Sequence, residues 1–424
     1  MKVIHTYIQH PGQSGSNIFF DELSNEMRKK GHKVSIITSD LKYRLDYFNF
    51  FTNPVIYKNS LIIKRIPFTI LRYINSRYSY SKKYKKLKFF DRIIFIIELK
   101  LTKFLKNISR VLKFSLLWGL LQDELGWKMY RFLRKENCDL IHTTSIPRSC
   151  ITSSLLVAKQ KKIPIMITPF YHFKMESYFL YDNLWMSILN KFDIINVCTN
   201  AEKDYLIKHG VDKRRIVKIG LGIYIQNYKN TERNYWRNKL DISEDKFVVL
   251  YINPEIDNLK KGILQVLGAA LNLPSIEFIF AGKDNKAWNR LISNYFPNKK
   301  MSNCYFIGYV SGEEKSKLFN DVDLVVRPSI NEALGIIYLE GLSAGKPIIT
   351  SNIESMKEIS ENVGYTVEHG NIVELVELIQ KLKMNISLYK KLSRNALQKV
   401  KNYSWENISK KFDTIYKILT NRYK

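Results

Sequence analysis

The sequence predicts an α/β protein of two Rossmann-like domains that face a cleft, and three observations support this prediction. The chain has 424 residues, whereas a single hydrophobic core stops growing near about 250 to 300 residues. Short apolar runs alternate with amphipathic stretches in two successive series, as in parallel sheets joined by crossover helices. With 45% apolar and 25% charged residues, the composition is that of a folded globular protein.

The first domain is expected over residues 1–228 and begins with a strand–helix–strand unit. Its elements are a strand over 2–8, a loop over 11–17, a helix over 18–30 that Gly31 ends, and a strand over 32–38. A parallel sheet built on such a unit has its ligand crevice outside the carboxyl ends of the strands, where this loop lies. Further strands are expected over 138–142, 164–168 and 194–198.

The second domain is expected over residues 229–403, where the same alternation begins again. Its strands are predicted over 247–252, 277–282, 304–308, 324–328 and 347–350, with helices between them. Residues 404–424 are expected to form a closing helix, for which packing back on the first domain is one arrangement. The cleft between two such domains is where we expect the chemistry.

The positive charge is concentrated in one region of the sequence. The formal net charge is +29, and residues 61–135 hold 19 Lys and Arg against four acids. Residues 81–121 combine helical apolar spacing with interleaved cations such as Lys100, Lys103 and Lys106. Two interpretations stay open. The segment packs on the first domain with its lysines solvated, or it docks on an anionic membrane surface and presents a lipid-linked acceptor to the cleft.

The expected location is the cytoplasm, with peripheral attachment to the inner face of the membrane as an option. The first apolar stretch, over residues 3–8, is too short for the core of a signal peptide. No run approaches the roughly 20 apolar residues that cross a bilayer. The cysteines lie far apart and suggest neither a zinc site nor a disulfide framework. They are Cys138, Cys150, Cys198 and Cys304.

The most informative segment covers residues 327–347, after a predicted strand and into a predicted helix. Unpaired amides at a helix N-terminus bind anions, so the first amides of this helix suit a diphosphate. Glu332 precedes the helix, whereas Glu340 lies roughly 7.5 Å further along its axis at about 1.5 Å per residue. Two carboxylates so placed can accept hydrogen bonds from hydroxyls at the two ends of one extended ligand. The amides belong to Leu334, Gly335 and Ile336.

With these residues the sequence resembles the retaining nucleotide-sugar glycosyltransferases of glycosyltransferase family 4. The segment from Glu332 to Glu340 matches the family's E-x7-E signature, and residues 344–349 match the string that follows it. Residues 3–15 resemble the family's first strand and glycine loop. Residues 31–34 resemble the entry to its second strand, and residues 404–406 resemble its closing helix. The resemblance implies the GT-B fold and transfer of a sugar, with retained configuration, from a nucleoside diphosphate sugar. It implies no metal and no other cofactor. The sequence does not identify the acceptor, for which a glycan, a polysaccharide or a lipid-linked molecule is the expectation.

The resemblance also implies roles for residues of the second domain. Glu340 would bind the nucleotide ribose, and Glu332 would contact the donor sugar. Lys261, in a pair with Gly262, would neutralise the donor diphosphate as it departs, which stabilises charge that develops in the transition state. Tyr309 would lie against the nucleotide base.

One departure from the family's pattern concerns the donor diphosphate. The family usually has a Gly-Arg pair just after the strand that precedes the lysine, whereas this chain has Asn253 and Pro254 there. Arg327, from the neighbouring strand, is a candidate to replace that arginine, and a surface or structural role is the alternative.

Further residues are assigned by the same resemblance. In the first domain, His172 would orient or polarise a hydroxyl of the donor sugar, and Gly15 would let the loop approach the phosphates from the opposite wall. Thr199 or Asn200 is interpreted as the cap of a helix. The D-x-D string at 321–323 is interpreted as structural, so no metal site is assigned there.

Three alternatives to sugar transfer stay open. The missing arginine would suit a catalytically silent GT-B scaffold, and nucleotide-sugar epimerases share this architecture. The charge of +29 would suit a nucleic-acid-binding protein, but neither zinc-finger spacing nor an RNA-recognition signature occurs, so no nucleic-acid partner is expected. The full E-x7-E segment favours transfer.

Overall fold

The computed structural model describes residues 1–7, 15–39, 55–58, 61–66, 124–144, 146, 148–171, 182–229, 231–299 and 301–423. The predictions that fall outside these ranges are the basic segment over residues 81–121, the assignment of His172 and most of the loop over 11–17. All statements on the structure below concern the described residues.

The first sheet contains eight strands within the described residues, in the order β3-β4-β2-β1-β5-β6-β7-β8. Every neighbouring pair is parallel except β3 with β4. The strands are β1 (Lys2–Thr6), β2 (Lys33–Ser39), β3 (Val55–Lys58), β4 (Leu61–Ile66), β5 (Leu140–Thr144), β6 (Ile165–Thr168), β7 (Ile194–Val197) and β8 (Ile216–Lys218). The helices between them include α1 (Gly15–Lys29), α5 (Glu124–Leu133), α6 (Ser149–Lys161), α8 (Asp182–Leu189) and α9 (Asn200–Lys208).

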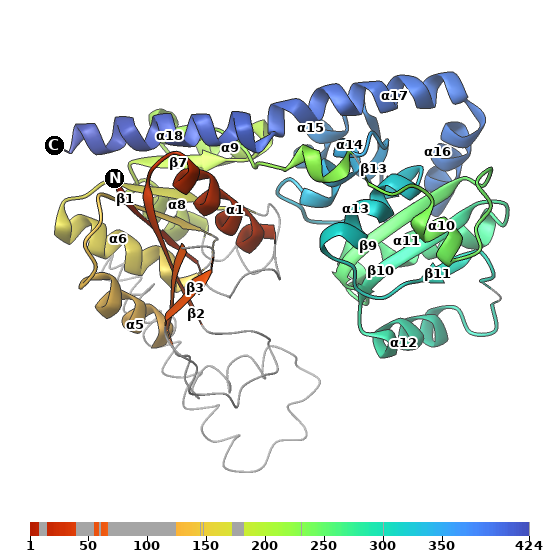
Figure 1. Ribbon diagram of the computed structural model, residues 1–424, viewed down its shortest axis with the longest axis horizontal. Coiled ribbons are helices and arrows are strands. Elements are labelled where there is room, and N and C mark those ends of the chain that lie inside the picture. Colours follow the sequence, from red (N-terminus) through yellow and green to blue (C-terminus); the bar gives the residue numbers. More distant parts are fainter. Residues whose placement is uncertain are drawn as a thin grey trace, which may run out of the picture.

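The second sheet has six described strands, all parallel, in the order β11-β10-β9-β12-β13-β14. They are β9 (Val248–Glu255), β10 (Glu277–Lys283), β11 (Cys304–Phe306), β12 (Leu324–Val326), β13 (Ile348–Ser351) and β14 (Gly364–Val367). Its helices are α10 (Tyr235–Lys239), α11 (Ile263–Asn272), α12 (Asn285–Tyr295), α13 (Gly312–Asp321), α14 (Ile336–Ser343), α15 (Glu354–Ser360), α16 (Ile372–Met384) and α17 (Ile386–Lys399). The two sheets with helices on their faces (Figure 1) confirm the predicted α/β class.

Several predicted boundaries differ from the structure, and two of them differ by three residues. Helix α1 begins at Gly15 rather than at residue 18, because Asn17 is buried with the helix rather than exposed in a loop. Strand β9 continues to Glu255 rather than ending at Ile252, because its ladder with β10 resumes at the pair Lys283 and Glu255 after an irregularity.

The chain passes between the two domains at two places, and backbone hydrogen bonds join these two segments. The amide of Ile223 donates to the carbonyl of Tyr403 at 2.8 Å, and the amide of Trp405 donates to the carbonyl of Ile223 at 3.1 Å. The buried Trp405 ring stacks on Phe19 of α1 at 5.9 Å between ring centroids. From this point α18 (Trp405–Arg422) runs along the first domain in line with α17 on the second (Figure 1).

Gly222 leaves the space that the Trp405 ring fills. A Cβ atom at this position would lie 2.1 Å from Cδ2 of the indole. We therefore expect Gly222→Ala to lower the free energy of unfolding by about 1–3 kcal/mol, the usual cost of overpacking, measured from urea denaturation. The matched comparison is the same substitution in a Trp405→Ala background, where the clash is removed. An equal loss in both backgrounds would show that the indole is not the cause.

Helix α18 also completes the core of the first domain through Tyr416. Its hydroxyl lies 3.1 Å from Nε2 of His5 on β1 and 2.6 Å from Nδ1 of His142 on β5. Nδ1 of His5 lies 2.6 Å from the Ser24 hydroxyl, and Nε2 of His142 lies 2.8 Å from the Thr168 hydroxyl. All five side chains are fully buried.

The proton positions in this chain of hydrogen bonds follow from Ser24. Its hydroxyl donates to the Phe20 carbonyl at 2.6 Å, so it accepts from Nδ1 of His5, and Nε2 of His5 accepts from Tyr416. The Tyr416 oxygen then accepts from Nδ1 of His142, whose Nε2 accepts from Thr168. Both imidazoles are neutral, because burial lowers the pKa of His5 to about 3 and that of His142 well below its usual value.

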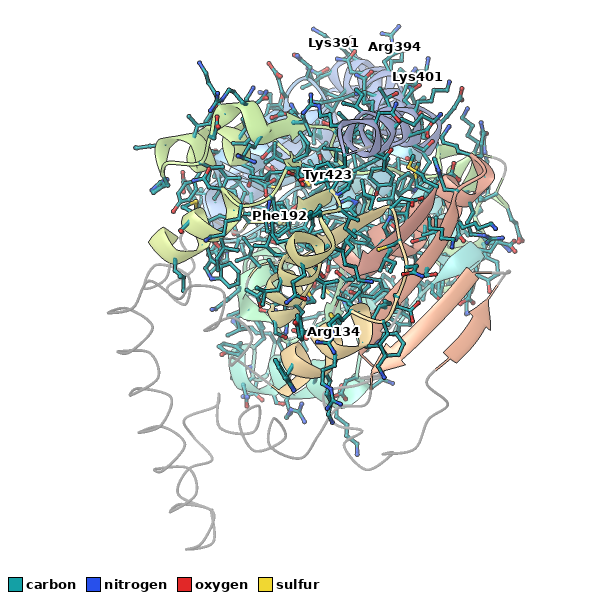
Figure 2. The ribbon with its side chains drawn as sticks, turned by 90° about the vertical axis from the view of Figure 1, so that its left-hand side faces the viewer. Arg134, Phe192, Lys391, Arg394, Lys401 and Tyr423 are labelled. Atoms are coloured by element: carbon teal, nitrogen blue, oxygen red, sulfur yellow. The ribbon has the colours of Figure 1, made fainter. Side chains whose placement is uncertain are left out.

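Positive charge is also present outside the basic segment. Figure 2 shows Lys391 and Arg394 of α17, and Lys401 beyond it, at the top of the view, with Arg134 well below them. All four side chains are exposed. None of the helices in the described part of the chain is both long and apolar enough to cross a bilayer.

Candidate functional site

The segment after β12 forms a tight loop that ends in the N-terminus of α14. Gly335 is the residue before α14 and has φ +76°. A Cβ atom there would also lie 2.6 Å from the Tyr338 ring, so glycine is required at this position. The helix begins at Ile336, with the amides of Leu334 and Gly335 in the turn before it.

Two cations converge on one oxygen of Glu332. Nζ of Lys261 lies 2.7 Å and an Nη atom of Arg327 lies 2.5 Å from Oε1 of Glu332. Lys261 also donates to the carbonyl of Asn331 at 3.2 Å. The three side chains carry a net charge of +1 in a mostly buried setting, which suits an approaching anion.

Arg327 is held as a buried group. Its side chain is 7% exposed, its guanidinium lies 5.6 Å from the centre of the Tyr338 ring, and its carbonyl accepts from the Tyr338 hydroxyl at 2.5 Å. Its buried Nε has no hydrogen-bond partner among the described residues. Arg327 therefore orients Glu332, and its role towards a diphosphate stays a prediction.

The turn that carries Lys261 is fixed against the same loop. Gly262 has φ +79°, and a Cβ atom there would lie 2.5 Å from the carbonyl oxygen of Pro328. The amide of Ile330 donates to the carbonyl of Lys260 at 2.9 Å. The predicted Lys261-Gly262 pair and the Glu332 loop therefore form one unit.

Glu340 lies on α14, 6% exposed, as the predicted helix requires. Its Oε1 accepts from Nζ of Lys315 on α13 at 2.6 Å, whereas its buried Oε2 has no hydrogen-bond partner among the described residues. The hydroxyl of Tyr228 lies close to this carboxylate, and burial, the charge of Glu340 and a hydrogen bond to Glu340 raise the pKa of Tyr228 well above its usual value. A carboxylate oxygen accepts more than one hydrogen bond, so the Glu340 carboxylate keeps capacity for a hydroxyl of a ligand beside Tyr228.

The carboxyl end of β9 supplies no cation of its own. The side chain of Asn253 is 5% exposed and donates to the carbonyl of Glu255 at 2.5 Å. The carboxyl end of the neighbouring strand β10 carries a cation instead, Lys283. Its Nζ lies 4.8 Å from the centre of the half-exposed Tyr309 ring. Tyr309 is therefore accessible for the predicted contact with a base, and the contact itself stays a prediction.

The first domain reaches the site through the start of α1. A Cβ atom at Gly15 would lie 3.3 Å from Cδ1 of Ile336, so the N-termini of α1 and α14 meet across the junction. His172 lies outside the described residues, but the amide of the preceding Tyr171 donates to Oε1 of Glu202 at 2.8 Å. Glu202 is buried, which raises its pKa to about 8.

Thr199 caps α9 as predicted, because its hydroxyl accepts from the amide of Glu202 at 3.2 Å. The D-x-D string is engaged within the second domain. The carboxylate of Asp321 accepts from the amides of Asn234 and Trp236, each at 2.7 Å. That of Asp323 accepts from Arg237 at 2.9 Å and from the amide of Val248 at 2.8 Å. These contacts are structural.

Lys315, Lys283 and Glu202 were not predicted as site residues. Lys283 follows a predicted strand directly, which could have marked it. Lys315 is 25 residues from Glu340, and no local pattern connects the two positions.

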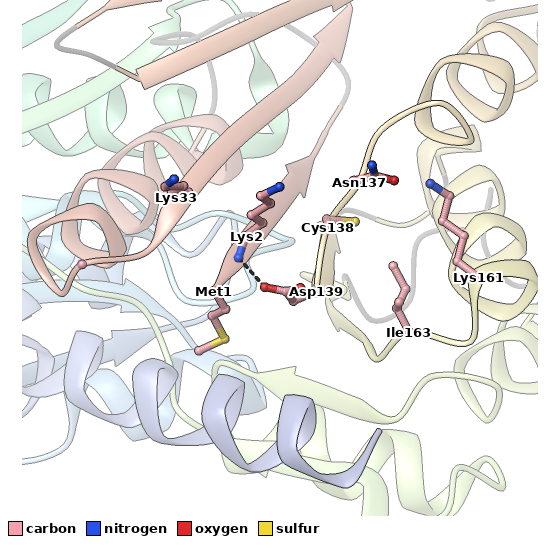
Figure 3. A pocket seen from close by; sticks show the side chains of 9 residues that line it. Met1, Lys2, Lys33, Asn137, Cys138, Asp139, Lys161 and Ile163 are labelled. Atoms are coloured by element: carbon pink, nitrogen blue, oxygen red, sulfur yellow. Dashed lines mark hydrogen bonds between the residues drawn. The ribbon is translucent and has the colours of Figure 1, made fainter. Parts of the chain in front are cut away.

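A pocket of about 700 Å³ lies elsewhere, at the amino ends of β1 and β2 (Figure 3). Lys2, Lys33 and Lys161 line it, and the amide of Lys2 donates to Asp139 at 2.6 Å. Because ligands of parallel sheets bind at the carboxyl ends of the strands, we do not assign this pocket to the candidate site.

Comparison with known proteins matches both halves of the chain to glycosyltransferases. A family described as "Glycosyl transferases group 1" matches residues 232–399, and one described as "Glycosyltransferase Family 4" matches residues 105–227. The processive diacylglycerol alpha-glucosyltransferase of Acholeplasma laidlawii is 26% identical over 58% of this chain and 76% of its own. Two uncharacterised glycosyltransferases of Methanocaldococcus jannaschii match as well. The alignments with these three relatives cover between 49% and 78% of each relative's own length.

Two solved structures share the fold over nearly the whole chain. Sucrose-phosphate synthase from Thermosynechococcus elongatus aligns with a TM-score of 0.73 and 18% identity, over 99% of both chains. Anabaena Alr3699/HepE in complex with UDP-glucose aligns with a TM-score of 0.69 and 13% identity, over 99% of this chain and 100% of that one.

Proposed function

We propose that this chain, which belongs to the GT-B glycosyltransferases of the family 4 and group 1 type, transfers a sugar from a nucleoside diphosphate sugar to a hydroxyl group with retained configuration. The observation that carries the proposal is the buried carboxylate of Glu340, on the same helix α14 whose N-terminus faces the Glu332 loop, with an Oε2 that no described residue contacts in ideal hydrogen-bond geometry. A carboxylate oxygen in that setting suits a ribose hydroxyl, and the helix amides suit the diphosphate.

In this proposal the donor extends from Glu340 to Glu332. The ribose binds Glu340, the diphosphate lies on the amides of Leu334, Gly335 and Ile336, and the sugar lies beside Glu332. The bond between the sugar and the diphosphate breaks, Lys261 stabilises the charge on the leaving group, and the acceptor hydroxyl attacks from the same face and gives up its proton to the departing phosphate. Closure of the domains excludes water during this step.

His172 and Gly15 would act from the first domain. His172 would orient a hydroxyl of the donor sugar, and Gly15 brings the N-terminus of α1 to Ile336, so that two helix dipoles point towards the diphosphate. The donor complex in the fold relative contains UDP-glucose, which makes UDP-sugars the first donors to test.

The acceptor in this proposal is a glycan or a lipid-linked molecule at an anionic membrane surface. The Acholeplasma relative is named for a diacylglycerol acceptor, and a relative from Escherichia coli is named for O-antigen biosynthesis. A net charge of +29 would attract anionic lipid head groups.

The test is a screen of UDP-, GDP-, ADP- and dTDP-sugars by thermal shift and calorimetry, with and without chelator. We expect one donor to bind the wild-type protein regardless of chelator, and Glu340→Ala to weaken it by about 10- to 100-fold, since a hydrogen bond to a charged group contributes about 1.5–3 kcal/mol. The control is Glu377→Ala, an exposed acid on α16. Absence of binding to every donor would favour the silent scaffold, and inversion at the anomeric carbon would contradict the stereochemistry.

A further inference from the structure

Lys315 of α13 binds the candidate ribose ligand, Glu340, from the neighbouring helix. Its Nζ lies 2.6 Å from Oε1 of Glu340 on α14. Both side chains are largely buried, with 21% of the Lys315 side chain and 7% of the Glu340 side chain exposed. Among the described residues, Lys315 is the one cation within ion-pair distance of Glu340. The lysine therefore supplies the counter-charge that a buried carboxylate requires.

The place of Lys315 within α13 is unfavourable for the helix itself. Lys315 is the fourth residue of a helix that begins at Gly312, and a cation in the first turn opposes the helix dipole. The other charged residues of this turn are acids, Glu313 and Glu314. The contact that offsets this cost is the ion pair with Glu340.

The ammonium group of Lys315 is also held by a second contact. It lies 6.0 Å from the centre of the ring of Phe319, one turn further along α13, and Phe319 is fully buried. The bond to Glu340 uses Oε1, whereas Oε2 has no partner in ideal hydrogen-bond geometry among the described residues. Lys315 thus binds one oxygen of the carboxylate and leaves the other to a ligand.

We propose that Lys315 is a positioning residue of the donor site, which fixes the Glu340 carboxylate so that Oε2 accepts from the ribose hydroxyls of the donor. This inference rests on the proposed function, because it takes Glu340 as the ribose ligand. Helix α13 begins shortly after Tyr309. One short segment then provides both the predicted contact with the base and the support of the contact with the ribose.

The experiment compares nucleoside diphosphates that differ only in the ribose hydroxyls. The probes are UDP, GDP and ADP, each with its 2′,3′-dideoxy form, and calorimetry measures the dissociation constants. For the base that binds, we expect the wild-type protein to prefer the ribose form by about 10- to 100-fold, the range of one hydrogen bond to a charged group. Lys315→Met should lower that preference by about tenfold, since residues in direct contact couple by amounts of this size.

Two controls separate positioning from a general effect of the substitution. Lys317→Met removes a lysine from the same helix, whose Nζ lies 2.9 Å from Glu232 and 3.1 Å from Glu313, and it should keep the wild-type preference. In a Glu340→Ala background, Lys315→Met should have no further effect on the preference, because the group that it positions is absent.

A purely structural role of Lys315 would lower the melting temperature, or weaken both forms of the nucleotide equally, and leave the preference for ribose intact. That result would overturn the inference. If Lys315→Met does not fold, Lys315→Gln is the milder change, because it retains a hydrogen-bond donor, and it should lower the preference in the same direction. A wild-type protein that binds both forms equally would overturn the inference while leaving sugar transfer standing. Failure of the wild type to bind any of the three nucleotides would overturn both.

Discussion

Replacing Lys261 with methionine is expected to lower the rate of sugar transfer by about 10²- to 10³-fold, the usual effect of removing one group that stabilises developing charge. Lys261 is fixed 2.7 Å from Glu332, so its charge is in place before the donor binds. Methionine keeps an unbranched side chain of similar bulk and lacks the terminal ammonium group. The measurement is initial-rate kinetics with the donor that the screen identifies.

The neighbouring residue provides a matched control. Lys260 is exposed, and only its backbone carbonyl bonds to the Glu332 loop. Lys260→Met should therefore retain the wild-type rate within about twofold, given the small contribution of exposed charges. Equal losses in the two variants would mean that general positive charge, rather than the position of Lys261, governs the rate.

Tyr416→Phe is expected to reduce the free energy of unfolding by about 2–6 kcal/mol, since a buried polar group without a partner costs about 1–3 kcal/mol and this change leaves two. Nδ1 of His142 loses its acceptor, and Nε2 of His5 loses its donor. Neither imidazole can reach water, because both residues are fully buried. Urea denaturation monitored by circular dichroism measures the loss.

Tyr423 is the control on the same side of the molecule. It is 42% exposed, and its hydroxyl donates to Asp193 at 2.8 Å. Water can replace that bond, so Tyr423→Phe should change the free energy of unfolding by less than about 0.5 kcal/mol. If Tyr416→Phe were equally mild, the hydrogen-bond chain through the two histidines would not contribute to stability.

The sequence predicted the parts of the fold that local patterns specify. Apolar runs identified β1, β2, β5, β6 and β7 in the first sheet and five strands of the second. The antiparallel pair β3 and β4 was not predicted, because its residues carry neither a family motif nor a glycine-marked turn. Strand β8 has only three residues, and β14 has intermediate burial along most of its length, so neither shows a clear apolar run.

The residues of the candidate site also fall into two groups, those that a local sequence pattern predicts and those that only the tertiary fold brings together. The loop, the helix start and the two carboxylates at Glu332 and Glu340 follow one another within a short segment, so their spacing could be interpreted directly. The partners of those carboxylates lie far away in sequence. Lys261 is 71 residues from Glu332, and Lys315 is 25 residues from Glu340. Such pairs depend on the tertiary fold, which a single sequence does not reveal.

The position of α18 also determines the order in which the protein can be completed during synthesis. Translation proceeds from the N-terminus, and domains generally fold as units as they emerge. Here the second sheet lies wholly before residue 368, whereas the first domain receives Tyr416 for His5 and His142 only from the last helix of the chain. The domain that is made first is therefore finished last, and until then its two histidines and the face of Phe19 stay open to water and to other chains.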